Sequence, residues 1–107
     1  MAVAWRTFKK PDGAAYRQVE ISEEADWQLF ERVATLLQVG LRGKWTEQLD
    51  GLDQRYWDSE ASSGKLTLHL EHYLGITLYP TAGEAADNKS VELLHAAYRL
   101  LAEETSI

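Results

Sequence analysis

The chain has 107 residues, the size of one small domain that buries roughly 65% of the surface of its unfolded form, so we expect a single domain over residues 1–107. It has no cysteine, which excludes disulfides, thiolate metal sites and cysteine nucleophiles. Its formal net charge is −6, and because acidic side chains repel phosphate backbones we expect no nucleic-acid partner.

The first residues predict a β-hairpin. Pro11, Asp12 and Gly13 form a turn signal, since proline presets φ and glycine permits a positive φ. The segments on either side, residues 3–9 and 15–21, are short candidate strands. No apolar segment follows the basic start, and no apolar run approaches the ~18 residues of a membrane span. We therefore expect no signal peptide, no membrane partner and a cytoplasmic protein.

A helix is predicted over about residues 22–39. Ser22 is the expected N-cap, because its hydroxyl can accept a hydrogen bond from a first-turn amide and acidic residues follow it directly. Apolar residues recur at helical spacing. This stripe consists of Trp27, Leu29, Phe30, Val33, Ala34, Leu36 and Leu37. We expect Trp27 to lie in the core and Gly40 to follow the helix as its C′ residue.

Four strands are predicted next. They cover residues 44–49, 53–61, 65–73 and 76–79, with turn signals between them. The third is the clearest, because leucine alternates with polar residues along it. Leu66, Leu68 and Leu70 then share one face, which we expect to be the inner face of the central strand. Gly75 marks a turn or bulge, and Pro80 ends the last strand.

A last helix is predicted over about residues 89–104, after a loop rich in small residues. Its apolar stripe consists of Val91, Leu94, Ala97, Tyr98 and Leu101. The order β-β-α-β-β-β-β-α favours the α+β class, with a single, mainly antiparallel sheet of about four to six strands. Because each helix has one apolar stripe and the central strand one apolar face, we expect both amphipathic helices to pack on one face of the sheet.

The opposite face of the sheet is the candidate binding face. By the two-residue period of a strand it carries Thr67, His69, Glu71, Tyr73, Thr77 and Tyr79. Aromatic residues on a solvent-facing sheet are typical anchors of interfaces. Trp5, Trp45 and Trp57 also lie in predicted strands and face either the core or this surface. Filling the core is the simpler interpretation for them.

Two histidines and a glutamate within residues 65–80 suggest a metal or acid–base site. On a strand, His69 and Glu71 share a face, whereas His72 points to the other face. Zinc sites need three or four converging ligands, so this set does not meet on one ion. We therefore expect His69 and Glu71 to form an exposed polar pair, with no metal, no cofactor and no catalytic residue.

Two further patterns have simpler structural interpretations. Acidic residues recur at Glu47, Asp50, Asp53, Asp58 and Glu60. A pair of carboxylates could do glycosidase-type chemistry, but such charges commonly serve solubility. Residues 40–43, G-L-R-G, have the G-x-x-G form of an RNA-binding KH loop. That loop needs a helix after it, and the residues that follow here are predicted to be extended.

The segment over residues 50–80, in which Y-W-D leads into L-T-L-H-L-E-H-Y-L-G-I-T-L-Y-P, resembles short bacterial proteins classed as a domain of unknown function. The resemblance extends over most of the chain, including the final helix. It implies a bacterial, cytoplasmic, small α+β protein. It assigns no catalytic residue.

The leading hypothesis is a non-catalytic module that binds another protein or itself. Residues 1–17 carry four basic residues and one acidic residue, a net charge of +3, whereas the remainder carries seven basic and sixteen acidic residues, a net charge of −9. A sharper version is therefore an immunity-type protein that neutralises a basic toxin. The alternative from another class is a small metal-dependent or hydrolytic enzyme that uses His69, Glu71 and Asp58. A small-molecule ligand is left open.

Overall fold

The computed structural model describes residues 1–9, 11–13 and 15–104; Lys10, one of the basic residues of the N-terminal segment, lies outside them. The elements are β1 (Ala4–Lys9), β2 (Ala15–Ser22), α1 (Trp27–Leu41), β3 (Lys44–Asp50), β4 (Gln54–Ala61), β5 (Gly64–Glu71), β6 (Gly75–Pro80), the short 3-10 helix η1 (Gly83–Ala85) and α2 (Asn88–Glu103). Their order confirms the predicted α+β class.

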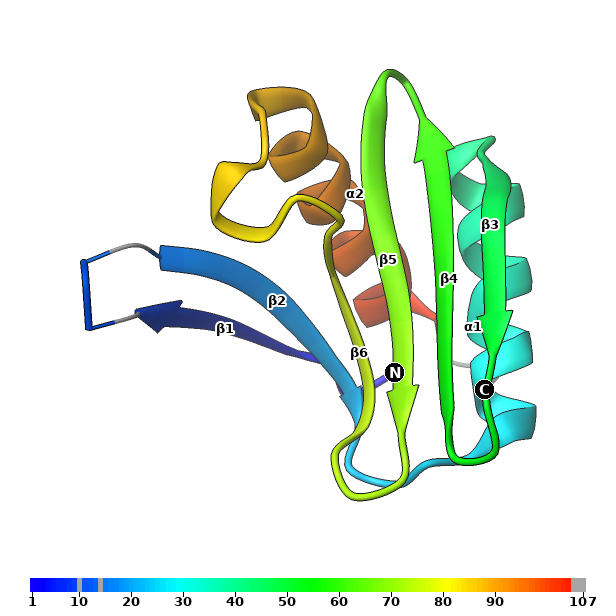
Figure 1. Ribbon diagram of the computed structural model, residues 1–107. Helices are drawn as coiled ribbons and strands as arrows, with labels where there is room; N and C mark the ends of the chain where they lie inside the picture. Colours follow the sequence, from blue (N-terminus) through cyan, green and yellow to red (C-terminus); the bar gives the residue numbers. More distant parts are fainter. Residues whose placement is uncertain (10, 14, 105–107) are drawn as a thin grey trace.

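The six strands form one open antiparallel sheet in the order β1-β2-β6-β5-β4-β3. Both α-helices lie on the same face of this sheet, as predicted, and Figure 1 shows them behind the strands. We call the opposite side the open face. Within the part of the chain that the structure describes, no helix is both long and apolar enough to cross a membrane.

The apolar side of β5 forms the centre of the core, as predicted. Leu66, Leu68 and Leu70 are fully buried under the helices, and β6 places Ile76 and Leu78 beside them. Full burial of one such side chain contributes about 1.5–3 kcal/mol to folding. The helices supply Phe30, Val33, Ala34, Leu37, Leu93, Leu94, Ala97 and Leu101 to the same core. The hydrophobic core therefore lies on one side of the six-stranded sheet, between the sheet and the helices.

The start of α1 differs from the prediction. Ser22 is the last residue of β2 and pairs with Ile76, so strand pairing takes precedence over its capping propensity. Its hydroxyl instead accepts a hydrogen bond from the amide of Glu24 at 3.0 Å, which closes a short turn. The N-cap is Asp26, whose Oδ1 accepts from the amide of Leu29 at 3.0 Å.

The end of α1 also differs from the prediction. Gly40 lies inside the helix, and Arg42 ends it in the left-handed conformation, with a φ of 53°. A Cβ at Gly40 would lie 2.4 Å from a methyl group of Leu100. Gly40 therefore serves the close approach of α1 to α2, not the cap. The G-x-x-G segment is the end of a helix followed directly by β3, which rules out the helix that a KH loop requires.

A buried arginine on β4 ties the sheet edge to α1, and sequence reasoning missed it. Arg55 is only 5% exposed. Its guanidinium lies 4.5 to 4.8 Å from the centres of three aromatic rings, those of Trp57, Trp27 and Phe30. It also donates hydrogen bonds to Asp50 at 2.9 and 3.2 Å and to Glu31 at 3.3 Å. The hydrogen bonds from Arg55 and then Trp57 lower the pKa of Asp50.

All four tryptophans lie on the helix side of the molecule. Trp5 stacks on His95 of α2, with ring centres 4.4 Å apart, and Trp45 meets Trp57 edge to face at 5.5 Å. Trp27 is 37% exposed and covers the guanidinium of Arg55, so its predicted place inside the core is wrong. The tryptophans therefore pack the helices against the sheet and leave the open face to other aromatic residues.

The turn between β5 and β6 is pressed against the end of β2. β5 ends at Glu71, two residues earlier than predicted, and Gly75 follows the turn with a φ of +88°. A Cβ at Gly75 would lie 2.0 Å from the carbonyl oxygen of Ser22 and 2.9 Å from the Cα of Glu23. This position therefore requires glycine for both its φ and its lack of a side chain.

Replacement of Gly75 by alanine should destabilise the fold far more than the same change at Gly13. Gly13 has a φ of +89°, but a Cβ there meets nothing within 4 Å. Gly13→Ala should therefore cost only the ~1–2 kcal/mol of a left-handed residue. Gly75→Ala adds a backbone collision and should cost about 3 kcal/mol or more. Urea unfolding measures both, and equal losses would contradict this account of the turn.

Candidate functional site

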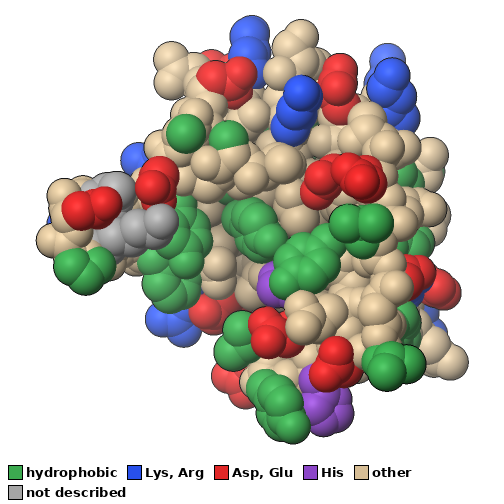
Figure 2. Space-filling view, in the orientation of Figure 1, with side chains coloured by type: hydrophobic (Ala, Val, Ile, Leu, Met, Phe, Trp, Pro, Cys, Tyr) green, Lys and Arg blue, Asp and Glu red, His purple; other side chains and the backbone are tan. Residues whose placement is uncertain are grey.

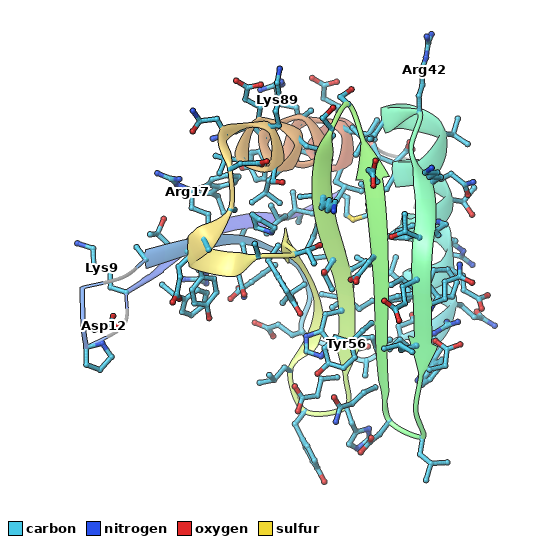
Figure 3. The ribbon with its side chains drawn as sticks, turned by 45° about the horizontal axis from the view of Figure 1, so that its top comes forward. Lys9, Asp12, Arg17, Arg42, Tyr56 and Lys89 are labelled. Carbon is cyan, nitrogen blue, oxygen red and sulfur yellow. The ribbon has the colours of Figure 1, made fainter. Side chains whose placement is uncertain are left out.

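The N-terminal hairpin extends beyond the sheet. β2 pairs with β6 only over residues 19–22, whereas the pairing of β1 with β2 continues out to Lys9 and Ala15. The outer part of the hairpin, residues 7–9, 11–13 and 15–17, therefore forms a two-stranded arm that bends away from the sheet (Figure 1). Lys9, Asp12 and Arg17 lie on this arm (Figure 3).

A groove of about 760 Å³ lies on the open face between the hairpin and β6. Its volume falls within the range of about 300–1,000 Å³ that is usual for ligand sites. Its lining residues are Arg6, Phe8, Tyr16, Gln18, Glu20, Ser22, Glu23, His69, Leu74, Thr77 and Tyr79. Figure 2 shows apolar and aromatic side chains gathered across the middle of this face, with acidic side chains around them.

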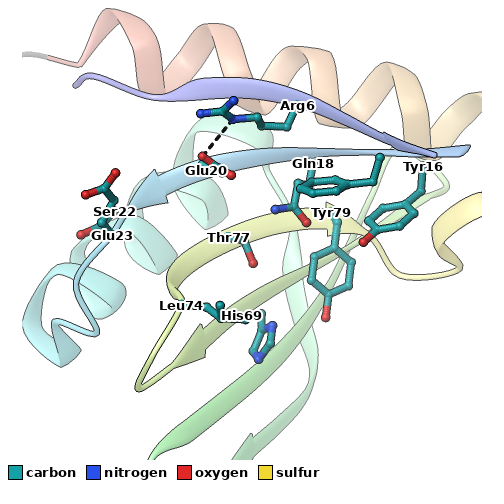
Figure 4. Close-up of a pocket in the computed structure, with 11 residues that line it drawn as sticks. Arg6, Tyr16, Gln18, Glu20, Ser22, Glu23, His69, Leu74, Thr77 and Tyr79 are labelled. Carbon is teal, nitrogen blue, oxygen red and sulfur yellow. Dashed lines mark hydrogen bonds and ion pairs between the residues drawn. The ribbon is translucent and has the colours of Figure 1, made fainter. Parts of the chain in front are cut away.

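The groove has an aromatic end and a carboxylate end. Phe8 stacks on Tyr16 with ring centres 5.3 Å apart, and Tyr79 projects from β6 at the same end (Figure 4). Glu23 lies at the other end, next to the turn between β5 and β6, and Glu20 lies between the two ends, opposite Thr77. The Nε of Arg6 contacts the Oε2 of Glu20 at 3.1 Å. The sequence of β2 sets this order from aromatic to acidic side chains, because alternate residues Tyr16, Gln18 and Glu20 all face the groove.

His69 is a wall of the groove and not the exposed polar residue that was predicted. Its ring stacks on Tyr56, with centres 4.1 Å apart, and meets the edge of Tyr79 at 6.1 Å. The side chain is 14% exposed, and its buried Nε2 has no hydrogen-bond partner among the described residues. Burial lowers the pKa of His69, and Glu71, whose Oε2 lies 3.9 Å from Nε2, offsets only part of this effect.

Next to Tyr79 on the open face, the side chains of Asp58, Thr67 and Thr81 form a polar cluster. Thr67 is 4% exposed and donates a hydrogen bond to Oδ1 of Asp58 at 2.7 Å, and its hydroxyl lies 2.9 Å from that of Thr81. Burial, and then the nearby Tyr56 and Asp58, raise the pKa of Tyr79 to about 12. Tyr79 therefore presents a protonated phenol beside the groove at neutral pH.

Not all residues of the candidate binding face lie together in the structure. Five of its residues lie on the open face of β5 and β6, namely Thr67, His69, Glu71, Thr77 and Tyr79. Tyr73 does not join them, because β5 has ended and the residue lies 84% exposed in the turn. His72 lies in the same turn, where its amide donates to the carbonyl of Asp53 at 3.0 Å. The groove itself takes in His69, Thr77 and Tyr79.

The candidate catalytic acids do not all share one site. Asp50 lies on the helix side with Arg55, whereas Asp58 lies on the open face with Thr67. Across residues 1–9, 11–13 and 15–104, no group of three or more histidine, aspartate or glutamate residues is placed to hold a metal ion. The acidic residues of β3 and β4 are therefore divided between the two faces of the sheet.

Sequence reasoning missed the contribution of the hairpin to the site. Arg6, Phe8, Tyr16, Gln18 and Glu20 join the groove because β2 pairs with β6, a contact between segments far apart in the chain. One signal was present: the polar and aromatic residues of β2 alternate with the buried Val19 and Ile21. That alternation places them on the same face as the polar residues of β5 once the strand order is known.

Acidification should destabilise the protein through His69. Because its folded pKa lies below the ordinary value of 6.5, the unfolded state binds more protons as the pH falls through that value. The free energy of unfolding should therefore fall between about pH 7.5 and pH 5.5, and His69→Gln should reduce this fall. Urea unfolding at both pH values measures the difference. An NMR titration midpoint of the His69 ring at or above 6.5 would contradict the burial.

Comparison with known proteins places the chain in a family. No curated protein and no solved structure matches it. The family described as "Protein of unknown function (DUF3630)" matches residues 12–98. This segment contains the strands from β2 to β6 and all the groove residues except Arg6 and Phe8. The chain therefore belongs to the DUF3630 family of proteins of unknown function.

Proposed function

We propose that the protein is a non-catalytic binding module whose open face receives a basic segment of another protein. The observation that carries this proposal is the aromatic groove of about 760 Å³ on the sheet face opposite both helices. Grooves that combine aromatic walls with a few charged groups are typical of recognition sites. The arm forms one wall, so the groove is built by the fold and not by a single loop.

The net charge of the open face favours a basic partner. Among the described residues, the acidic side chains of the open face and its margin are Glu20, Glu23, Glu47, Asp58, Glu60 and Glu71, and the basic ones are Arg6, Lys44 and Lys65. By strand alternation, Lys9 and Arg17 of the arm lie on its other side. A basic segment complements this excess of negative charge. A second copy of the chain would place acidic residues against acidic residues, which disfavours self-association through this face. An immunity-type protein that neutralises a basic toxin is one form of the same proposal.

The groove's titratable rings suit binding better than proton transfer. A general base must lie within hydrogen-bond reach of the proton that it removes. The Nε2 of His69 is buried, and the raised pKa of Tyr79, about 12, keeps its phenol protonated. The ring of Tyr79 lines the groove as an aromatic surface for a ligand, and the ring of His69, stacked on Tyr56, packs against it. This supports recognition over the alternative of a small hydrolytic enzyme that uses His69.

Selection of displayed random peptides against the immobilised protein tests this proposal. Thr77 lies in the middle of the groove, between Glu20 and His69 in the sheet. Thr77→Arg should fill the groove and weaken the selected peptides roughly tenfold or more. Thr35→Arg on the exposed side of α1 is the matched control and should leave binding unchanged. Selected peptides that are rich in lysine or arginine are expected.

Two results would reject the proposed function. One is a selection that enriches no peptide. The other is a set of peptides that bind the Thr77→Arg and Thr35→Arg variants equally well, since binding would then lie outside the open face.

A further inference from the structure

We propose that the groove is a pocket for one arginine side chain of the partner's basic segment. This inference rests on the proposed function and adds the chemistry of its recognition. A guanidinium is planar, stacks on aromatic faces and forms paired hydrogen bonds with carboxylates. The groove offers aromatic walls at one end, and two carboxylates in its middle and at its other end.

The chain already holds one of its own arginines with this chemistry. On the helix side of the sheet, the guanidinium of Arg55 lies over three rings and binds two carboxylates, those of Asp50 and Glu31. On the open face, the rings of Phe8, Tyr16 and Tyr79 and the carboxylates of Glu20 and Glu23 provide the same kinds of group. Two differences are that the groove is open to solvent and that its rings and its carboxylates are separated along its length.

The spacing of the groove suits a side chain with an apolar stem and a charged head. Glu20 lies opposite Thr77, and Tyr79 is two residues further along β6, a distance of about 7 Å on a strand. The aliphatic stem of an arginine can lie along Thr77 and the ring of Tyr79, with its head towards Glu20 and Glu23. An aromatic and aliphatic floor therefore joins the two ends.

The carboxylates are accessible to an incoming cation. The side chain of Glu23 makes no hydrogen bond or ion pair within the described residues 1–9, 11–13 and 15–104. Glu20 is paired with Arg6, but the two side chains are 36% and 58% exposed. Exposed pairs of this kind contribute little to stability, so Glu20 can exchange Arg6 for a ligand.

An NMR titration of the isotope-labelled protein tests this assignment. The probe is the blocked tripeptide acetyl-Gly-Arg-Gly-amide, and its citrulline counterpart is the neutral control of the same shape. We expect saturable shifts of the backbone amides of Gln18, Glu20 and Thr77 with the arginine peptide. Binding of the citrulline peptide should be roughly tenfold weaker, because the cation is lost.

Adjacent glutamates provide a matched pair of variants. Glu23 lines the groove, whereas Glu24 is exposed and does not line it. Glu23→Gln should weaken the arginine peptide several-fold, and Glu24→Gln should leave it unchanged. Phe8→Leu should weaken it as well, because the aromatic stack with Tyr16 is lost.

Several outcomes would overturn the inference. They are the absence of saturable shifts, equal binding of the citrulline peptide, equal effects of the two glutamate variants, and tighter binding of acetyl-Gly-Glu-Gly-amide through Arg6. Displayed peptides that bind the open face without any need for arginine would also overturn it. That last result would leave the proposed function standing, so the failure of one is distinguishable from the failure of the other.

Discussion

Two helices cover one face of a six-stranded sheet, and within the part of the chain that the structure describes no helix covers the other. Burial of the apolar side of β5 under these helices drives this arrangement, because Leu66, Leu68 and Leu70 must leave water together. The two-residue period of the strand then forces Thr67 and His69 to the opposite side. β5 therefore contributes to both sides of the sheet, with its leucines in the core and Thr67 and His69 on the open face.

The groove depends on how the hairpin is attached to that sheet. β2 joins β6 over a few residues only, so the arm leaves the sheet and stands beside it as a wall. Gly75 allows the turn after β5 to approach the end of β2, which places Leu74 near Glu23 at the carboxylate end. In this member of the DUF3630 family, the arm and the turn therefore give the open face a defined groove with acidic and aromatic side chains. Both properties support recognition of a basic segment.

The spacing of apolar residues along the sequence predicted the helices and strands. The site instead depends on pairing between strands that are far apart in the sequence. The alternating leucines of β5 and the stripes of both helices were sufficient to place the helices on one side of the sheet. The burial of His69 was missed because it depends on Tyr56, which a neighbouring strand supplies. Arg55 was missed for a similar reason, since its rings and carboxylates come from three separate elements. Ser22 was predicted as the N-cap of α1, but its pairing with β6 keeps it in β2, and Asp26 caps the helix instead.

The central claim is that the open face, and not the helix side, meets the partner. Photo-crosslinking inside cells tests it most directly, with a benzophenone amino acid placed at position 77 in the groove or at position 35 on α1. Our account predicts a discrete crosslinked product from position 77 and none from position 35. A product from position 35 alone, or no product from either position, would contradict it.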